Sequence, residues 1–514
     1  MKKAVLSIII TALLMLPACR ENDTLNPKDT GSEVKTDTSE YTGTRPTVTP
    51  AESITDGGEN ISEPSPGADF PENEENADDR NNSAGKDDKY NTGKYTGPLI
   101  DGVVSDMLTP LFWTDLCKDP DKVIMTYDRI TAYNTENFRN LPFLFDFRDL
   151  PDTVNGSEIR KWINELSIVP GSARYDGNGN KYQQKDYEAL KENLNTGEIS
   201  GTVNVRYGIT VKRTQMRTWP SLKQSFSSAT NRQIDYFTET AVYAAEPVLV
   251  YHTSRDGQWY FAQVYNYKGW IPVTDVALCS KQELADYVAF GDFVVVTGPV
   301  VYTPESKDSR ISRLQLDMGV KLRVLSENSE GYTVNYPVCD NSNNLEFVRM
   351  TLPSDEDISR EFPDYTVKNV LIQAFKFLGE PYGWGGMNNA RDCSAFVADV
   401  YRAFGIILPR NTDQQEKAAG SVSLKGKNRS ERLEILDSLR PGTLLYMPGH
   451  AMMYLGKWQN RHYIIHDVPT VYRKGTDGNL IPIRLNQVSV TPLDICNSKG
   501  TEYIMLLTAA VQIE

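Results

Sequence analysis

The chain has 514 residues, 39% of them hydrophobic, which is enough for about three or four domains with a substantial core. Its formal net charge is −14, and residues 20–97 alone hold 18 acidic against 8 basic residues. Because much of the excess acid lies in this one segment and no basic stripe occurs elsewhere, nucleic-acid binding is excluded as a function class.

Residues 1–19 have the pattern of an export signal. Lys2 and Lys3 precede an apolar run that ends in Leu-Pro-Ala-Cys at Cys19. The run is too short to span a bilayer comfortably as a mature helix. Its ending resembles a bacterial lipobox and predicts that Cys19 is lipidated; the alternative is an ordinary cleaved signal peptide with an incidental cysteine. The expected location is the bacterial cell envelope, with the exported protein lipid-anchored to a membrane.

Residues 20–97 differ in composition from everything that follows. They are rich in Asp, Glu, Asn, Thr, Ser, Pro and Gly and poor in aliphatic side chains. Such a segment cannot bury enough apolar surface to offset its ordering entropy. We therefore predict a disordered acidic tether, a solvated spacer that gives the folded part reach above the membrane.

Residues 98–200 are predicted to form a mostly helical segment. Apolar side chains recur at helical spacing, as at Ile159, Trp162, Ile163 and Leu166. We interpret the aromatic residues of this segment as core or interdomain packing rather than as ligand contacts.

Two small β-barrels are predicted next, because the hydrophobic period changes to two near Thr202 and Gly, Asp and Asn interrupt short strands. In residues 201–282, a strand with Asp256-Gly-Gln-Trp-Tyr is followed by Gly269-Trp-Ile, which resembles a bacterial SH3-like domain. Residues 283–358 show a second set of strands without the Gly-Trp signal. Barrels of this kind bind peptides or polymers, or here form walls of a catalytic cleft.

The stretch 382–405 contains the candidate nucleophile, Cys393. A glycine-rich turn precedes it, and the apolar residues after it have the spacing of an amphipathic helix. Cys393 is thereby placed in the first helical turn. Free backbone N–H groups and partial positive charge at this end of a helix can stabilise a thiolate and a neighbouring oxyanion.

Three of the four histidines, His450, His462 and His466, lie in residues 359–514. A thiol with the usual pKa of about 8.5 is largely protonated at neutral pH, so a cysteine nucleophile needs an imidazole base and a group that orients it. A hairpin folded about Trp458 would bring His450, the predicted base, opposite His466, its predicted partner. His462 shares the strand parity of His466 and competes for the third role. Metal-ligand spacing is absent, so no cofactor or metal is expected.

Five short motifs follow one another in residues 359–514. They are Tyr382-Gly-Trp-Gly-Gly, Asp392-Cys-Ser-Ala-Phe-Val, Leu408-Pro-Arg, Pro441-Gly-Thr-Leu and Gly449-His-Ala-Met-Met-Tyr-Leu-Gly. This series resembles the NlpC/P60 family of papain-like cell-wall cysteine peptidases, in particular the multi-domain branch with gamma-D-glutamyl-L-diamino acid endopeptidases. The implied fold class is α+β, with a papain-like C-terminal cysteine peptidase domain preceded by two small SH3-like β-barrels and a mostly helical N-terminal segment.

The resemblance implies a reaction and roles for individual residues. Family members cleave the amide between D-glutamate and the diamino acid of peptidoglycan stem peptides through a thioester. Cys393 would be the nucleophile, His450 the base and His466 the third, polar residue. The Tyr382 hydroxyl would assist the oxyanion. Asp392 and Ser394, which flank the nucleophile, would recognise the free amine of an N-terminal L-Ala, since a carboxylate beside the cleft pairs with an ammonium.

Two departures from the family pattern and two competing functions accompany this prediction. Ala395 stands where a glycine is usual and narrows the space near the nucleophile, and the loop before His466 is longer than in compact members. The main alternative is a non-catalytic peptidoglycan-binding lipoprotein that uses its SH3-like domains; the other is acyl transfer to lipid. The expected partners are peptidoglycan stem peptides and a membrane through the lipid anchor, and we expect a monomer.

Overall fold

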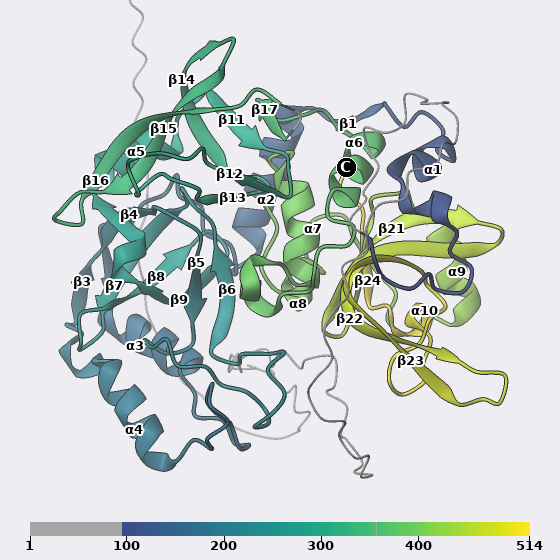
Figure 1. The fold of residues 1–514 in the computed structure, drawn as a ribbon, viewed down its shortest axis with the longest axis horizontal. Helices are drawn as coiled ribbons and strands as arrows, with labels where there is room; N and C mark the ends of the chain where they lie inside the picture. The colour runs from purple at the N-terminus through teal and green to yellow at the C-terminus, as the bar shows by residue number, and fades with distance from the viewer. Residues whose placement is uncertain (1–94, 356) are drawn as a thin grey trace, which may run out of the picture. The chain divides into compact units, whose positions relative to one another are not determined.

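A computed structural model describes residues 95–355 and 357–514 (Figure 1). The predicted export signal, Cys19 and the predicted tether as far as residue 94 lie outside these residues. Within the described ranges, no helix has both the length and the apolar character needed to cross a membrane.

The helices that precede residue 200 belong to two different hydrophobic cores. Trp113 and Ile130, from the first two helices, pack in one cluster with the C-terminal domain. Ile159 and Leu190, from the next two, pack in a second cluster with the β-strands that follow. The helices are α1 (Pro110–Asp115), α2 (Tyr127–Asn140), α3 (Gly156–Leu166) and α4 (Gln184–Asn193), with 3₁₀ turns η2 (Ser105–Leu108) and η3 (Thr196–Glu198).

A seven-stranded antiparallel sheet follows, in the order β10-β4-β7-β8-β9-β5-β6. The predicted Gly-Trp signal lies in β9, where the Trp270 side chain is completely buried. Its strands are β4 (Arg206–Thr210), β5 (Thr214–Arg217), β6 (Thr238–Val242), β7 (Pro247–Thr253), β8 (Trp259–Val264), β9 (Tyr267–Pro272) and β10 (Val276–Cys279). A smaller ribbon joins β2 (Thr153–Asn155) to β3 (Thr202–Asn204).

A five-stranded antiparallel sheet comes next, in the order β16-β15-β14-β11-β17, with a separate ribbon of β12 and β13. Helix α5 (Lys281–Val288) connects it to the previous sheet and begins at a capping box of Ser280 and Glu283. The strands are β11 (Phe293–Val296), β12 (Val300–Tyr302), β13 (Gln315–Asp317), β14 (Lys321–Asn328), β15 (Gly331–Cys339), β16 (Leu345–Leu352) and β17 (Ile358–Arg360).

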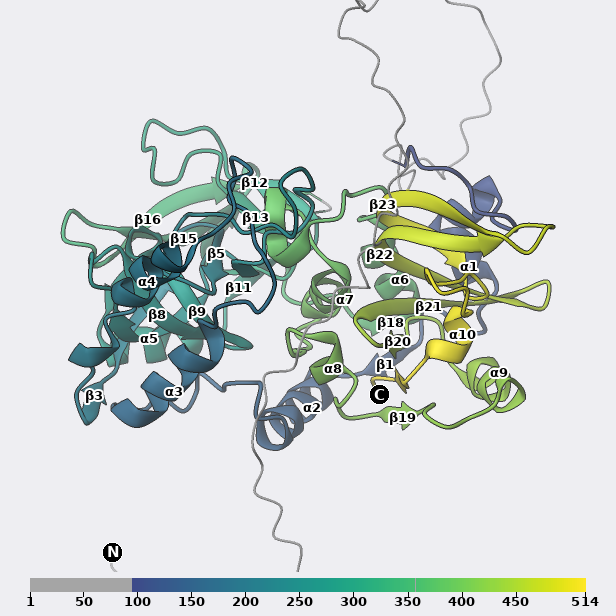
Figure 2. The ribbon, with the colours of Figure 1, turned by 90° about the horizontal axis from the view of Figure 1, so that it is seen from below.

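The C-terminal domain is built on a six-stranded antiparallel sheet in the order β19-β24-β20-β21-β22-β23. Figures 1 and 2 both place α7 between this sheet and the strands of the preceding sheets. Short strand β1 (Val123–Met125) pairs with β18 (Tyr365–Thr366) and so joins the N-terminal helices to this domain. Its other elements are α6 (Val367–Phe375), η5 (Trp384–Asn389), α7 (Cys393–Arg402), α8 (Thr412–Gln415), β19 (Ser421–Ser423), α9 (Arg429–Ser438), β20 (Leu444–Met447), β21 (His450–Trp458), β22 (Arg461–Lys474), β23 (Leu480–Pro492), α10 (Tyr503–Leu506) and β24 (Ala509–Val511).

Candidate active site

Cys393 is the first residue of α7, and the residue before it caps the helix. The Asp392 carboxylate accepts a hydrogen bond of 3.0 Å from the backbone N–H of Ala395, as expected of an N-cap side chain. The glycine turn folds back onto the same carboxylate, because Gly385 N–H donates to it at 3.0 Å. Positive φ angles of 56° at Gly385 and 86° at Gly386 make this tight return favourable for glycine. The turn and the helix start are thus joined through Asp392.

His450 and His466 form a hydrogen-bonded pair beside the nucleophile. His450 Nε2 lies 2.8 Å from His466 Nδ1, and both side chains are buried. His466 Nε2 in turn lies 3.0 Å from the hydroxyl of Thr491 on β23. The start of β21 lies against the start of α7, and the backbone N–H of Ala451, the residue after His450, acts to lower the pKa of the Cys393 thiol.

The hairpin that carries the two histidines has a different register from the one predicted. Its turn lies at Gln459 and Asn460, both with positive φ, because Trp458 already pairs with Arg461. Farther from the turn, the two strands pass a β-bulge, and beyond it Met453 pairs with Ile465. Continued in this register, His450 would face Val468 rather than His466. The shift is two residues, and since side chains alternate with period two, both histidines remain on one face.

His462 takes part in a separate group of contacts. Its Nδ1 lies 2.8 Å from the Tyr454 hydroxyl, and its Nε2 lies 3.4 Å from a carboxylate oxygen of Asp437. Of the two histidines considered for the third role, it is therefore His466 that the structure places against His450.

The ionisation states of Cys393 and His450 differ from what the position of Cys393 at a helix start alone suggests. Burial, and then the negative charge of Asp392, raise the pKa of the Cys393 thiol to about 12, although the Ala451 N–H acts in the opposite direction. Burial lowers the pKa of His450 to about 4. Desolvation thus acts against the stabilisation of a thiolate that was expected at the helix start. At neutral pH, both groups are uncharged in this structure.

Asp392 and Ser394, predicted as substrate contacts, form a closed cluster with Arg410. The guanidinium donates to Asp392 at 2.6 Å and to the Ser394 hydroxyl at 2.8 Å, and Ser394 donates to Asp392 at 3.2 Å. Burial opposes ionisation of Asp392, but Arg410 and the backbone N–H groups of Ala395 and Gly385 hold its pKa below the usual range. Its carboxylate therefore already has internal donors. Any contact with a substrate amine would add to them.

Arg410 was not among the predicted site residues, although it ends the Leu408-Pro-Arg motif. Besides Asp392 and Ser394, it donates to the Thr240 hydroxyl of β6 at 2.6 Å. It therefore links the residues around the nucleophile to the seven-stranded sheet. The Leu408-Pro-Arg motif was the signal that could have identified Arg410. Nothing in the motif indicated that Arg410 contacts Asp392, 18 residues earlier in the chain.

Tyr382 lies close to the nucleophile, and its hydroxyl is neutral. Burial, followed by the charges of the Cys393 thiolate form and Asp392, raises its pKa well above the usual value. A neutral phenol can donate a hydrogen bond to an oxyanion, whereas a phenolate cannot. Thus Tyr382 retains the donor that its predicted role requires.

Thr491 and Asp467 are two further polar residues of the site that sequence reasoning did not assign. The alternation of Val488-Ser-Val490-Thr was a signal that Thr491 lies in a strand, but not that it meets His466. Asp467 is completely buried, and within the described residues neither carboxylate oxygen has a hydrogen-bond partner. Burial, and then Glu380 and Asp392, raise its pKa well above the usual value. Asp467 is therefore a neutral acid beside the site.

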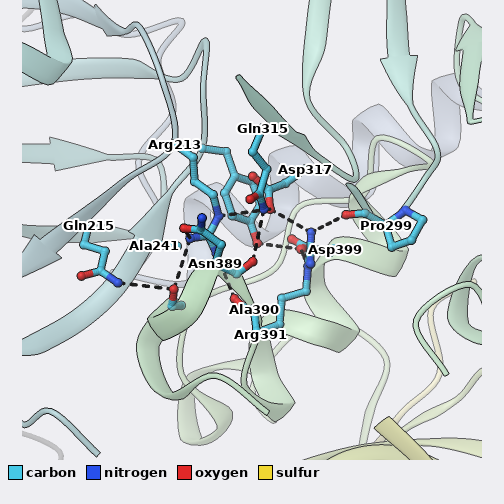
Figure 3. Close-up of polar contacts among 12 residues, drawn as sticks. Arg213, Gln215, Ala241, Pro299, Gln315, Asp317, Asn389, Ala390, Arg391 and Asp399 are labelled. Atoms are coloured by element: carbon cyan, nitrogen blue, oxygen red, sulfur yellow. Dashed lines mark hydrogen bonds and ion pairs between the residues drawn. The ribbon is translucent and has the colours of Figure 1, made fainter. Parts of the chain in front are cut away.

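A buried ion network centred on Arg391 holds the chain just before Cys393 (Figure 3). Its guanidinium donates to Asp399 at 2.5 Å, to Glu380 at 2.8 Å, to Asp317 at 2.9 Å and to the backbone oxygen of Pro299 at 2.7 Å. Asp399 lies on α7, whereas Asp317 ends β13. The network thus ties the catalytic helix to the second set of strands.

Arg213 extends this network to the first set of strands. It donates to Asp317 at 3.2 Å and to the backbone oxygen of Ala390 at 2.9 Å (Figure 3). Ala390 lies three residues before Cys393. Both sets of strands therefore contact the segment that positions the nucleophile, as expected if they form walls of the site.

Across residues 95–355 and 357–514, no group of three or more His, Cys, Asp or Glu side chains is arranged to hold a metal ion.

A buried cysteine at a helix start, packed against an antiparallel sheet that carries a hydrogen-bonded histidine, is the arrangement of a papain-like domain. Comparison with known families identifies the domain further. Residues 379–474 match the NlpC/P60 family, and residues 220–272 match the SH3 domain of the SH3b1 type. The chain therefore contains an NlpC/P60 domain and an SH3-like domain, which confirms the resemblance recognised in the motifs.

Curated relatives match part of the chain. It is 25% identical over 191 residues to a gamma-D-glutamyl-L-lysine dipeptidyl-peptidase of Bacillus cereus, covering 37% of this chain and 54% of that protein. A Bacillus subtilis protein of the same name is 29% identical over 114 residues, covering 21% and 38%. The chain thus spans about half the length of the first relative and less of the second.

A solved structure shares the fold over most of the described residues. An NlpC/P60 endopeptidase from Photobacterium damselae subsp. piscicida superposes with a TM-score of 0.60 at 20% identity, covering 77% of this chain and 94% of that one. Together with the SH3 match, this confirms the predicted α+β fold class, with a papain-like C-terminal domain and an SH3-like β region.

Proposed function

We propose that this protein is a peptidoglycan cysteine endopeptidase that cleaves the bond between D-glutamate and the diamino acid of stem peptides and requires a free N-terminal L-Ala. The observation that carries the proposal is the placement of Cys393 at the start of α7, beside the hydrogen-bonded chain of His450, His466 and Thr491. The NlpC/P60 match and two relatives named gamma-D-glutamyl-L-lysine dipeptidyl-peptidase support the reaction class.

The hydrogen-bonded chain favours one arrangement of protons. His450 can accept the thiol proton at Nδ1 only if its own proton is on Nε2, which then donates to His466 Nδ1. His466 must then carry its proton on Nε2 and donate it to the Thr491 hydroxyl oxygen. Thr491 is thus a positioning residue that selects the tautomer in which His450 is a base.

The reaction begins from neutral partners. As the Cys393 sulfur attacks the amide carbon, its proton passes to His450, whose imidazolium form is stabilised by the bond to His466. The oxyanion accepts hydrogen bonds from the Tyr382 hydroxyl and from backbone N–H groups at the start of α7. His450 then protonates the leaving amine, which leaves a thioester. Water hydrolyses the thioester, with His450 as the base, and regenerates the thiol.

The requirement for a free amine is the finer part of the proposal. Asp392 and Ser394 would be the contacts for the ammonium, in addition to their bonds with Arg410. A substrate whose L-Ala is linked to muramic acid has no ammonium and would leave this acidic site without its partner. A peptidase that requires a free amine would act on released stem peptides rather than on the intact cell wall.

The decisive experiment follows products from defined substrates by mass spectrometry. The free stem tetrapeptide and its N-acetylmuramyl form are incubated with the wild type, with Cys393→Ala and with Cys339→Ala, which removes a cysteine outside the site. We expect the wild type and Cys339→Ala to release L-Ala-D-Glu from the free peptide. Cys393→Ala should release none, and the N-acetylmuramyl form should not be cleaved. Release by Cys393→Ala would refute the reaction, and equal rates on both substrates would refute the amine requirement.

The alternative function makes a different prediction in the same samples. A non-catalytic peptidoglycan-binding lipoprotein would be retained on isolated peptidoglycan and yield no product.

We also propose, from the sequence pattern of residues 1–19, that the protein is exported and anchored through a lipid on Cys19. Incorporation of an alkyne-labelled fatty acid into the wild type, and its loss in Cys19→Ala, would test the anchor.

A further inference from the structure

A cavity lies at the opposite end of α7 from Cys393. It has a volume of about 300 Å³ and is bordered by α2, α5, the start of β14 and Arg402, the last residue of α7. At 1.5 Å per residue, Arg402 is about 14 Å from Cys393 along the helix. None of Cys393, His450, His466 or Tyr382 lines the cavity. It is therefore distinct from the candidate active site.

Aromatic side chains from four parts of the chain line this cavity. Such a lining, at the lower end of the volume range of small-molecule sites, suits an apolar body of modest size. Phe362 stacks on Tyr127, with ring centroids 6.0 Å apart. The aromatic lining comprises Tyr127, Phe145, Tyr265, Tyr287, Phe290 and Phe362, among others.

The first residue of β14, Lys321, brings a cation into this aromatic lining. Its Nζ lies 4.6 Å from the ring centroid of Phe293, 5.2 Å from that of Phe290 and 5.7 Å from that of Phe362. Across residues 95–355 and 357–514, no ion pair within 4.0 Å involves this ammonium. Ring faces attract a cation, but they replace a carboxylate only in part.

The other charged side chains of the cavity compensate one another. Arg402 pairs with Glu246, and Arg148 pairs with Asp146 at 2.6 Å. Lys321 is therefore left as one positive charge in excess. Burial, and then Arg402, lower its pKa to about 8, so it is still mostly protonated at pH 7.

We propose that this cavity binds a small monocarboxylate with an aromatic or aliphatic body, whose carboxylate pairs with Lys321 and whose apolar part lies among the rings. A bound carboxylate would supply the charge partner that the protein does not provide, in surroundings where the pairing is screened little by water. The binding energy is divided between one ion pair and the burial of apolar surface. This site is independent of the proposed peptidase activity.

The test uses 4-phenylbutyrate as the probe and 4-phenyl-1-butanol as its uncharged counterpart. Calorimetry on the full chain is expected to show the acid binding at least about tenfold more tightly than the alcohol, the size of effect that one partly buried ion pair can give. In Lys321→Met, which keeps an apolar stem, this preference should vanish. In Lys417→Met, which removes an exposed lysine over Phe143 outside the cavity, it should persist. Equal affinity for acid and alcohol, no binding of the acid, or an unchanged preference in Lys321→Met would overturn the proposal.

A second measurement on the wild type does not depend on the folding of a variant. Reductive methylation of lysines is followed by peptide mass spectrometry with the acid, with the alcohol and with neither. We expect the acid to slow methylation of Lys321 several-fold and to leave Lys417 unchanged. Equal rates at Lys321 under all three conditions would count against the site. Loss of acid binding after alkylation of Cys393 would place the probe in the active site and also contradict the proposal.

Discussion

Cys393 and His450 are uncharged for the same reason, which is that both side chains are removed from water. Desolvation penalises the thiolate and the imidazolium alike, so it raises one pKa and lowers the other. Cys393 and His450 are therefore a neutral proton donor and a neutral proton acceptor rather than a preformed ion pair. In the proposed reaction, attack by the sulfur and transfer of its proton therefore occur together, so the rate depends on the orientation of His450.

The buried state of His450 has a consequence for stability against pH. In the unfolded chain, an imidazole takes up its proton near pH 6.5, whereas folded His450 does so only at about 4. Its contribution to stability is therefore present above about pH 6.5 and is lost as the pH falls toward 4. We expect acidification from pH 7 to pH 5 to lower the free energy of unfolding by about 2 kcal/mol through this residue.

Urea unfolding of the wild type and of His450→Gln at the two pH values measures this contribution. The variant should lose about 2 kcal/mol less than the wild type between pH 7 and pH 5. A wild type and a variant with the same pH dependence would show that the pKa of His450 is not lowered.

The role of Thr491 can be separated from general packing. Thr491→Val keeps the shape but removes the acceptor for His466 Nε2–H, so the productive tautomer is no longer favoured. We expect kcat to fall about tenfold or more, as for other residues that orient a catalytic imidazole, with KM little changed. Thr491→Ser retains the hydroxyl and should restore most of kcat. An unchanged kcat in the valine variant, or equal losses in both variants, would contradict this role.

At the scale of elements, the glycine turn η5 is shaped by its contact with β6. A Cβ atom added at Gly386 would lie 2.5 Å from the Cβ of Ala241 and 3.1 Å from its backbone nitrogen. Neither atom can rotate away, unlike the end of a flexible side chain. The turn therefore has no room for a side chain, and it leads directly to the N-cap of the catalytic helix.

Gly386→Ala and Gly426→Ala form a matched pair for this contact. Both glycines have positive φ, 86° and 76°, but a Cβ at Gly426 meets no atom within 4 Å. We expect Gly426→Ala to cost about 1 kcal/mol from backbone strain alone. Gly386→Ala should cost about 3 kcal/mol, since overpacking adds to the strain, and should also lower kcat. Equal losses of unfolding free energy would show that the contact with β6 is not restrictive.

For the molecule as a whole, the Arg391 network connects the strands to the candidate active site. One buried guanidinium joins α7 to β13, and Arg213 continues the link to the loop between β4 and β5. The helix that carries Cys393 is thereby connected to both sets of strands. Both sets of strands therefore have a structural role next to Cys393, whether or not they bind a ligand.

Arg391→Met tests how much this network contributes. It leaves Asp317, Asp399 and Glu380 without their shared cation in a buried site, which should cost about 3–5 kcal/mol of unfolding free energy. Arg310→Met is the control, because Arg310 also joins two carboxylates but at the surface, and its loss should cost at most about 1 kcal/mol. Chemical denaturation of both variants gives the comparison. Similar costs would mean that the buried network does not hold the domains together.

The sequence by itself determined those features that depend on the pattern of a few neighbouring residues. Helical spacing after a glycine turn placed Cys393 at a helix start, and period-two segments located strands such as β8 and β9. The rarity of histidine pointed to His450 and His466. Even a register error of two residues left these side chains on one face, because strand parity tolerates an even shift.

Tertiary structure alone decided what depends on distances between remote segments. Thr491, Arg410 and Arg391 acquire their roles through partners such as His466, Thr240 and Asp317, which lie 25, 170 and 74 residues away, and no local pattern encodes such contacts. The direction of the shift in the Cys393 pKa could not be predicted from the sequence either, because desolvation is a property of the assembled core and here acts against the effect expected of the helix start. The cavity around Lys321 likewise exists only where α2, α5, β14 and α7 meet.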